Sequence, residues 1–374
     1  MIQIFSNSLG DDEAAAVKCV LASKWLGRGK ECEGFEKELS SYFGTDETLL
    51  FNCCTSAIYA MLKAHGIGAG DEVIVSTVNF VAVASAVVEL GAKPVFADVD
   101  PDYFNILPSE ITRLKTKKTR AVFILHYGGH PAPFDEIKAA AGRDVLILED
   151  SANSVASKYK GVHCGALGDG GAFSFDAMKI LVMGDGGALI LRDPAIRAKA
   201  KALRYLGYGE GTTSGSEASK TGKLRWWEYD LECASGRFIS NDIQASMGRI
   251  QLQKLPGFIA RRKQIWDYYQ ANLKGIAGLG LPPEPLTQTS SSYYLYWIKV
   301  PGKRNELAAF LKEKGIYTTF RYFPLHLVKF YGDSSKLKNA EEMNENTLNI
   351  PVHQNLTDAE VQQIVDAVRA FFKA

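Results

Sequence analysis

A lysine and a pair of carboxylates stand at the ends of predicted strands, where side chains can take part in chemistry. Phe173-Ser-Phe-Asp-Ala-Met-Lys179 ends one apolar run with a lysine, and another run ends with Glu149 and Asp150. A lysine among apolar residues is partly desolvated, which lowers its pKa and favours attack on an aldehyde. A buried aspartate can either cap the next helix or pair with a cationic ring nitrogen.

A third signal is the start of a predicted helix. In Phe51-Asn-Cys-Cys-Thr-Ser-Ala57, either Thr55 or Ser56 is a natural N-cap. The backbone N–H groups at a helix start can bind phosphate, although most caps of this type serve only the helix. Each signal alone is weak. Together, the lysine, the aspartate and the helix start meet the needs of pyridoxal phosphate, whose ring nitrogen must stay protonated.

The elements that carry these residues predict an α/β fold. Short β-branched runs alternate with helical patterns, which indicates a doubly wound, mostly parallel sheet. Continuous apolar runs, as at 121–125, are typical of strands covered on both faces. The predicted strands are 72–75, 94–97, 121–125, 145–148, 172–175 and 188–191, and the predicted helices include 56–64, 81–90 and 134–141.

The pattern changes after about residue 205. A loop over 207–223 is followed by a helical pattern from 241 to about 273, which Pro256 is predicted to kink or break. Strands at 293–300 and 316–320 and helices at 304–314 and 358–372 then predict a small C-terminal α+β domain. We therefore expect a large domain over 1–250 and a small domain over 251–374.

Composition excludes several classes of protein. The chain has 374 residues, enough for about two domains, and its 43 basic and 42 acidic residues leave a net charge of +1. Neither a nucleic-acid nor a membrane partner is expected. The six cysteines form no C-x-x-C pair and the six histidines show no metal-ligand spacing. With no secretory signal at the start, the predicted setting is the cytoplasm, and no metal is expected.

The full series of motifs resembles the DegT/DnrJ/EryC1/StrS family of pyridoxal-phosphate-dependent aminotransferases. This fold-type-I family acts mainly on nucleotide-linked keto sugars. The resemblance covers nearly the whole chain, in order, which makes it specific. Its segments include 23–29, 66–73, 79–82, 91–96, 149–150, 174–175, 184–187, 242–245, 261–262 and 324–326, together with Lys179.

The resemblance implies a role for each matching residue. Lys179 would form a Schiff base with pyridoxal phosphate and then move the proton during transfer. Asp150 would pair with the pyridine nitrogen, and Phe80 would pack on the ring. The phosphate would be held by Thr55, Ser56 and Ser174.

Three positions depart from the family pattern. Asn153 stands where the family commonly has glutamine beside the ring hydroxyl, and it is one methylene shorter. Arg237 stands where the family often has an asparagine that reaches the cofactor phosphate of the neighbouring subunit. Arginine suits a phosphate by charge, but a substrate contact or a structural ion pair is equally open. Cys53-Cys54 replaces a small Ser-Gly, for which packing is the simple interpretation.

The resemblance also implies a homodimer with its active site at the interface. The reaction would be ping-pong, with glutamate as the amino donor and a nucleotide-linked keto sugar as the acceptor. The substrate would lie against Trp25, the loop over 207–229 and the stretch 320–326, which includes His326. The loop carries the aromatic residues Trp226, Trp227 and Tyr229.

Other readings remain open. Relatives that act on a keto-inositol or a similar non-nucleotide cyclic ketone keep the lysine, whereas sugar dehydratases of the family replace it with histidine. A nicotinamide oxidoreductase is disfavoured because Gly66-Ile-Gly-Ala-Gly70 lacks a complete G-x-G-x-x-G. A non-catalytic regulatory protein that binds pyridoxal phosphate is the alternative from a different class, and no DNA-binding helix pair supports it.

Overall fold

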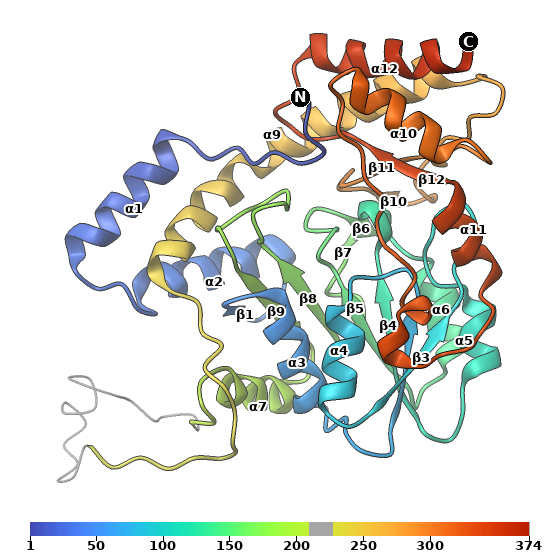
Figure 1. Ribbon diagram of the computed structural model, residues 1–374. Coiled ribbons are helices and arrows are strands. Elements are labelled where there is room, and N and C mark those ends of the chain that lie inside the picture. The colour runs from blue at the N-terminus through green and yellow to red at the C-terminus, as the bar shows by residue number, and fades with distance from the viewer. Residues whose placement is uncertain (209–226, 374) are drawn as a thin grey trace.

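The computed structural model describes residues 1–208 and 227–373, and a seven-stranded sheet lies at its centre (Figure 1). The strand order is β1-β9-β8-β5-β4-β2-β3. Only β9 runs against the other six strands, since both of its pairings are antiparallel. The strands are β1 (Thr48–Phe51), β2 (Glu72–Ser76), β3 (Lys93–Ala97), β4 (Thr119–Leu125), β5 (Leu146–Asp150), β8 (Gly170–Ser174) and β9 (Gly187–Leu191).

Helices cover both faces of this sheet. Along β4, Val122 and Ile124 pack into one core, whereas Phe123 and Leu125 pack into the other. This alternation follows from the pleat of a strand and explains why the run is apolar throughout. The prediction of strands covered on both faces is confirmed. One face carries α3 (Cys54–Ala64), α4 (Ala82–Glu89) and α7 (Pro194–Arg204), and the other carries α5 (Pro108–Leu114) and α6 (Phe134–Ala141).

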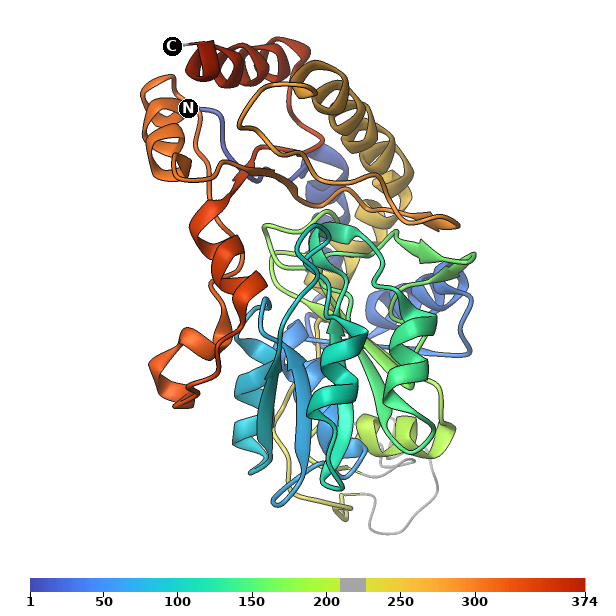
Figure 2. The same cartoon turned by 90° about the vertical axis from the view of Figure 1, so that its right-hand side faces the viewer.

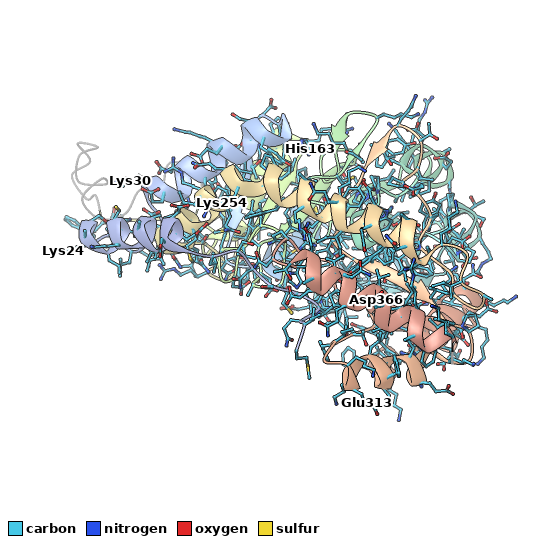
Figure 3. All side chains as sticks on the ribbon, turned by 90° about the horizontal axis from the view of Figure 1, so that it is seen from above. Lys24, Lys30, His163, Lys254, Glu313 and Asp366 are labelled. Carbon is cyan, nitrogen blue, oxygen red and sulfur yellow. The ribbon has the colours of Figure 1, made fainter. Side chains whose placement is uncertain are left out.

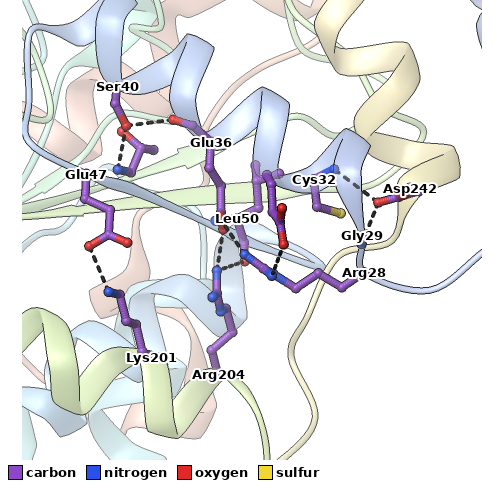
Figure 4. Close-up of polar contacts among 12 residues, drawn as sticks. Arg28, Gly29, Cys32, Glu36, Ser40, Glu47, Leu50, Lys201, Arg204 and Asp242 are labelled. Atoms are coloured by element: carbon purple, nitrogen blue, oxygen red, sulfur yellow. Dashed lines mark hydrogen bonds and ion pairs between the residues drawn. The ribbon is translucent and has the colours of Figure 1, made fainter. Parts of the chain in front are cut away.

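Two helices precede the sheet, α1 (Asp11–Ser23) and α2 (Lys30–Phe43). Glu36 of α2 links three elements (Figure 4). Its carboxylate accepts the N–H of Leu50 in β1 at 2.8 Å and pairs with Arg28 at 2.6 Å and with Arg204 of α7. Because Arg204 is buried, its ion pair with Glu36 holds α2 and α7 against β1, the edge strand of the sheet.

The long helix α9 (Asp242–Leu273) runs from α1 and α2 at one end to the C-terminal helix at the other (Figure 3). Its first residue, Asp242, caps α2 by accepting the N–H groups of Gly29 at 2.8 Å and Cys32 at 3.1 Å. A break at Pro256 is a wrong prediction, since the helix continues through it. Proline has no N–H, so one hydrogen bond of the helix is lost at Pro256. Contacts on both sides of this residue compensate for the loss. Before it, Lys254 pairs with carboxylates of α1, and after it, the buried Arg262 donates to backbone carbonyl oxygens of the C-terminal residues.

Beyond the central sheet, the C-terminal residues build a two-stranded sheet with helices beside it (Figures 1 and 2). Strand β11 (Tyr296–Lys299) pairs antiparallel with β12 (Thr347–Ile350), beside α10 (Arg304–Glu313), α11 (Lys338–Asn346) and α12 (Asp358–Lys373). The strand predicted at 316–320 is reduced to two bridges, Ile316 with Ile2 and Thr319 with Asn349. The remaining short elements are β6 (Lys158–Tyr159), β7 (Val162–His163), β10 (Thr289–Ser290), η1 (Tyr127–Gly129), η2 (Leu325–Leu327) and η3 (Lys329–Tyr331).

Candidate active site

A cavity of about 270 Å³ lies at the carboxyl ends of the central strands. Ligands of open α/β sheets bind at this edge, because the loops that leave the strands meet there. The loops after β1, β2, β5 and β8 supply most of the lining, and the segment between α10 and α11 adds Arg321 and Tyr322. The other polar or aromatic lining residues are Thr55, Asn79, Phe80, Asp150, Asn153, Ser174, Asp176, Lys179 and Asp185.

Lys179 lies in the loop between β8 and β9, and its side chain is partly buried. Its Nζ is 5.0 Å from the centre of the Tyr294 ring. Burial lowers the pKa of this ammonium, but Tyr294, Tyr322 and Asp150 outweigh burial and raise the pKa above the ordinary lysine value. The apolar neighbours alone predict a lowered lysine pKa. The structure corrects this, because ionisable groups distant in sequence converge on the amine.

The two carboxylates at the end of β5 serve different purposes, since successive residues of a strand face opposite sides. Asp150 lines the cavity, and its Oδ1 accepts the N–H of Ala152 at 3.1 Å. Burial raises the pKa of Asp150, while this N–H opposes the shift. Glu149 is not part of the lining and is fully buried. Its carboxylate lies 2.9 Å from Nε2 of His126 and accepts backbone N–H groups of the loop 165–168. Asp150 is therefore the carboxylate that a ligand can reach.

The N-terminus of α3 faces the same cavity, whose lining includes Cys53, Cys54 and Thr55. The prediction of Thr55 or Ser56 as N-cap is wrong. The N-cap is Cys53, and no side chain makes the capping hydrogen bond. The helix starts earlier than the Thr-Ser pattern suggests, so the N–H groups of 54–56 lie in the first turn, without an acceptor among the residues that the structure describes. A helix start of this kind suits an anion such as phosphate.

Close packing holds this turn in place. Ser56 is not part of the lining, and its Oγ lies 2.6 Å from Oδ1 of Asn52. At Gly187, the first residue of β9, an added Cβ would lie 2.5 Å from the carbonyl carbon of Cys53. Only glycine permits this approach, which accounts for part of the glycine-rich segment before β9. Burial raises the pKa of the Cys54 thiol well above its ordinary value, as expected for a packing group rather than a nucleophile.

An aromatic residue and an amide complete the cavity. The Phe80 side chain is 54% exposed, so one face of its ring is free for a ligand. Asn153 donates from Nδ2 to the Tyr322 hydroxyl at 3.3 Å, while its buried Oδ1 has no partner among the described residues. Ser174 also lies in the lining. Sequence reasoning did not single out Asn79, although it directly precedes Phe80 in a segment that the family resemblance includes, and it covered Arg321 and Tyr322 only as part of the stretch 320–326 expected beside the substrate.

Comparison with known proteins identifies the family of this chain. The model of the DegT/DnrJ/EryC1/StrS aminotransferase family matches residues 7–369. The chain belongs to this family. It is 39% identical over 373 residues to the dTDP-4-dehydro-2,3,6-trideoxy-D-glucose 4-aminotransferase of Saccharopolyspora spinosa, which covers 98% of this chain and 95% of that protein.

Solved structures of aminotransferases have the same fold. The aminotransferase TlmJ from Streptoalloteichus hindustanus superposes with a TM-score of 0.93 at 41% identity, over 99% of this chain and 98% of that chain. Spr1654 from Streptococcus pneumoniae, in a PMP form, gives 0.92 at 27% identity over 100% and 99% of the two chains. The fold-type-I architecture and the aminotransferase class predicted from the sequence are confirmed.

In this member of the DegT/DnrJ/EryC1/StrS family, four residues predicted at the site lie outside the cavity lining: Ser56, described above, Trp25, Arg237 and His326. Trp25 is exposed and donates from Nε1 to the Arg28 carbonyl at 3.1 Å. Arg237 is exposed, with its guanidinium 5.8 Å from the centre of the Tyr205 ring. Their predicted roles stay predictions, and for Arg237 the resemblance implies a contact with the cofactor of a neighbouring subunit.

His326 is buried and joins the loop after β2 to α11. Its Nδ1 lies 2.7 Å from Oγ1 of Thr77, and its Nε2 lies 3.4 Å from Glu341. Both ring nitrogens are therefore engaged within the protein, and a substrate contact stays a prediction. Most of the loop predicted at 207–229, including Trp226, lies outside the described residues, whereas Trp227 and Tyr229 are described and exposed.

Within the described part of the chain, no helix is both long and apolar enough to cross a membrane. No group of three or more His, Cys, Asp or Glu side chains there is placed to hold a metal ion.

Proposed function

We propose that this protein is a pyridoxal-phosphate-dependent aminotransferase that moves an amino group from L-glutamate to the keto group of a nucleotide-linked sugar. The observation that carries the proposal is the meeting of Lys179, Asp150, Phe80 and the α3 N-terminus in one cavity. The name of the 39% identical relative and the PMP form of Spr1654 support it. The proposal includes a large domain over 1–250 and a small one over 251–374, although residue 250 lies within α9.

The cavity fits pyridoxal phosphate because it holds unsatisfied polar atoms of the right kinds. Oδ1 of Asn153 and Nδ2 of Asn79 are buried without partners among the described residues, as are the N–H groups at the start of α3. That helix start would hold the phosphate, together with Thr55 and Ser174. Asp150 would face the ring nitrogen, and the free face of Phe80 would pack on the ring.

The bound cofactor would supply an electron sink for the electron pair released at the substrate Cα. Asp150 would provide the negative charge that keeps the ring nitrogen in its protonated form. Lys179 would move the proton at the substrate Cα through its Nζ. A cation against Asp150 would weaken one of the interactions that raise the pKa of Lys179, so the amine would lose its proton more readily.

A cytoplasmic homodimer is part of the same proposal. At the rim of the cavity, Phe80, Val81 and Met178 are 54%, 42% and 44% exposed. Neighbouring exposed apolar side chains beside a functional site are typical of an interface. A second copy of the chain would cover this rim and exclude water from the cavity.

The experiment that tests the proposal separates the two halves of the reaction. The protein loaded with pyridoxal phosphate is mixed with L-glutamate alone, and the change in cofactor absorbance and the release of 2-oxoglutarate are followed. A thymidine-diphosphate 4-keto sugar is then added, and the aminated sugar is identified by mass spectrometry. Amination of a keto-inositol but not of this sugar would favour the non-nucleotide alternative. Cofactor binding without either half-reaction would favour a regulatory protein.

A further inference from the structure

Tyr294 carries a hydroxyl group that the surrounding protein leaves without a partner. The residue lies just before β11, its side chain is fully buried, and its Oη forms no hydrogen bond with any described residue. A buried hydroxyl without a partner is destabilising, because it has lost its hydrogen bonds to water and gained none in return. Such a group indicates either a partner that arrives at another stage or a defect that packing tolerates.

The amine of Lys179 is a candidate for that partner. Its Nζ lies 5.0 Å from the centre of the Tyr294 ring, and it too makes no hydrogen bond within the part of the chain that is described. Burial lowers the pKa of Lys179, and Tyr294 is the strongest of the groups that raise it, ahead of Tyr322, Asp150 and Cys54. Two unsatisfied polar groups therefore lie beside each other.

The phenol ring of Tyr294 is held in place from three directions. The N–H of this residue donates to the carbonyl of Gly128 at 2.8 Å, and its carbonyl accepts Nη1 of the buried Arg262 at 3.4 Å. Phe5 stacks on the ring, with the two ring centres 5.5 Å apart. The hydroxyl therefore has a fixed position, whereas the flexible chain of a lysine can bring its amine to the hydroxyl.

The hydroxyl of Tyr294 lies behind the cavity, since Tyr294 is not among the lining residues and Lys179 is. A ligand in the cavity is therefore placed to contact the lysine rather than this hydroxyl. The other phenol near the amine, that of Tyr322, lines the cavity and accepts Nδ2 of Asn153 at 3.3 Å. The effect of Tyr294 on a ligand would therefore pass through Lys179.

We propose that Tyr294 positions Lys179, because its hydroxyl forms a hydrogen bond with the amine whenever the amine is free of the cofactor. The inference rests on the proposed function, since it needs Lys179 as the reacting amine. A hydroxyl both accepts and donates hydrogen bonds, so it accepts an N–H of the ammonium and donates its O–H to the neutral amine. Burial raises the pKa of Tyr294, so the hydroxyl keeps its own proton in both cases.

The decisive variant is Tyr294→Phe, which removes only the hydroxyl and keeps the ring against Phe5. The matched control is Tyr296→Phe, because the hydroxyl of Tyr296 is also buried without a partner among the described residues. Tyr296 begins β11, and its ring packs on Trp266 at 4.7 Å and on Tyr269 at 4.9 Å. If packing simply tolerates both hydroxyls, or if each binds a trapped water, the two variants should behave alike.

The first readout needs no cofactor. The apoprotein is treated with acetic anhydride at a series of pH values, and acetylation of Lys179 is quantified by peptide mass spectrometry. Only the neutral amine reacts, and the hydroxyl stabilises the ammonium, so its removal should lower the pKa of Lys179. Below the midpoint of the curve, we expect Lys179 to be acetylated about tenfold faster in Tyr294→Phe than in the wild type, with no change in Tyr296→Phe.

The second readout is the rate of each half-reaction of the loaded enzyme. At saturating substrate, the rate should fall about 10- to 100-fold in Tyr294→Phe, the effect of losing a hydrogen bond to a charged group. The half-saturating substrate concentration should change less than about threefold, because Tyr294 lies outside the lining. If Tyr294→Phe fails to fold, Tyr294→His replaces it. Its smaller ring does not reach the place of the hydroxyl, so the rate should fall at least about threefold.

Several results would overturn the inference. One is equal acetylation of Lys179 in the wild type and in the Tyr294 variant. Another is an unchanged rate of both half-reactions in that variant. A change confined to the half-saturating concentration would assign Tyr294 to substrate binding instead. Failure of the wild-type protein to take up pyridoxal phosphate would overturn the proposed function, whatever the acetylation result.

Discussion

The two sides of the cavity differ in how they are built. The side formed by the sheet carries its residues at or just after strand ends, as Asp150 follows β5 and Ser174 ends β8. The other side comes from an irregular segment between α10 and α11 that brings Arg321 and Tyr322 over the sheet. The first side is positioned by the strands themselves. The second is positioned by contacts between residues far apart in the sequence, such as the N–H that Arg321 donates to Oδ1 of Asn349 at 2.8 Å.

The largest effect is expected on the sheet side, at Lys179. Lys179→Ala should reduce the rate of both half-reactions by at least about 10⁴-fold, since the variant loses its reacting amine and its proton carrier. Stopped-flow measurement of each half-reaction checks this. A variant that keeps more than a tenth of the wild-type rate would remove Lys179 from the catalytic role.

The next effect concerns Asp150. Asp150→Asn removes the charge that favours a protonated ring nitrogen, and kcat should fall about 100- to 1,000-fold. Asp176→Asn is the control, because Asp176 also lines the cavity but accepts a backbone N–H of its own loop. Equal losses in the two variants would show that the position of the carboxylate at the end of β5 has no special importance.

The free energy of unfolding should depend on pH through His130, which packs the loop after β4 against α9 and β11. This buried histidine follows β4 and packs on Trp266 at 4.9 Å and Trp297 at 5.1 Å. Burial lowers the pKa of His130 to about 3. Its contribution to stability is complete above the unfolded pKa, about 6.5, and is lost as the pH falls toward the folded pKa.

Between these values the unfolded state binds the additional proton, so His130 should cost about 1.4 kcal/mol of unfolding free energy per pH unit. Urea unfolding of wild type and His130→Gln at several pH values between 4 and 7 measures the difference in slope. His163 and His353, whose pKa values burial lowers to about 4, add slopes that both proteins share. Parallel curves for the two proteins would contradict the assignment to His130.

The smallest effect is expected where the two sides touch. Asn153 follows β5, and its amide donates to the Tyr322 hydroxyl of the small domain. Asn153→Ala should weaken pyridoxal phosphate binding by roughly 2- to 10-fold, the value of one net hydrogen bond. Fluorescence titration of the apoprotein with the cofactor gives this ratio. No change at all would indicate that the unpartnered Oδ1 of Asn153 does not serve the cofactor.

Much of the sheet side was predictable from the sequence, because a strand end and its following residue have local signals. Lys179, Asp150 and Phe80 do line one cavity, although their roles stay proposals. Local signals fail where tertiary contacts decide the outcome. Arg321 belongs to the stretch 320–326 that was expected beside the substrate, but its place in the lining depends on tertiary contacts such as that of its N–H with Oδ1 of Asn349.

Boundaries of helices show the same limit. Thr55 and Ser56 have the chemistry of an N-cap, but the helix begins at Cys54 because β1 and the close approach of Gly187 set the position of the turn. Pro256 has the chemistry of a helix breaker, but α9 continues through it while packing against α1, α2 and α12.

The central claim is that Lys179 is the residue that binds pyridoxal phosphate covalently. The most direct measurement supplies the cofactor to the purified protein, reduces it with borohydride and locates the added mass by peptide mass spectrometry. The account predicts a yellow protein that bleaches on reduction, with the adduct on Lys179 and none in Lys179→Ala. A protein that takes up no cofactor, or an adduct on a different lysine, would contradict it.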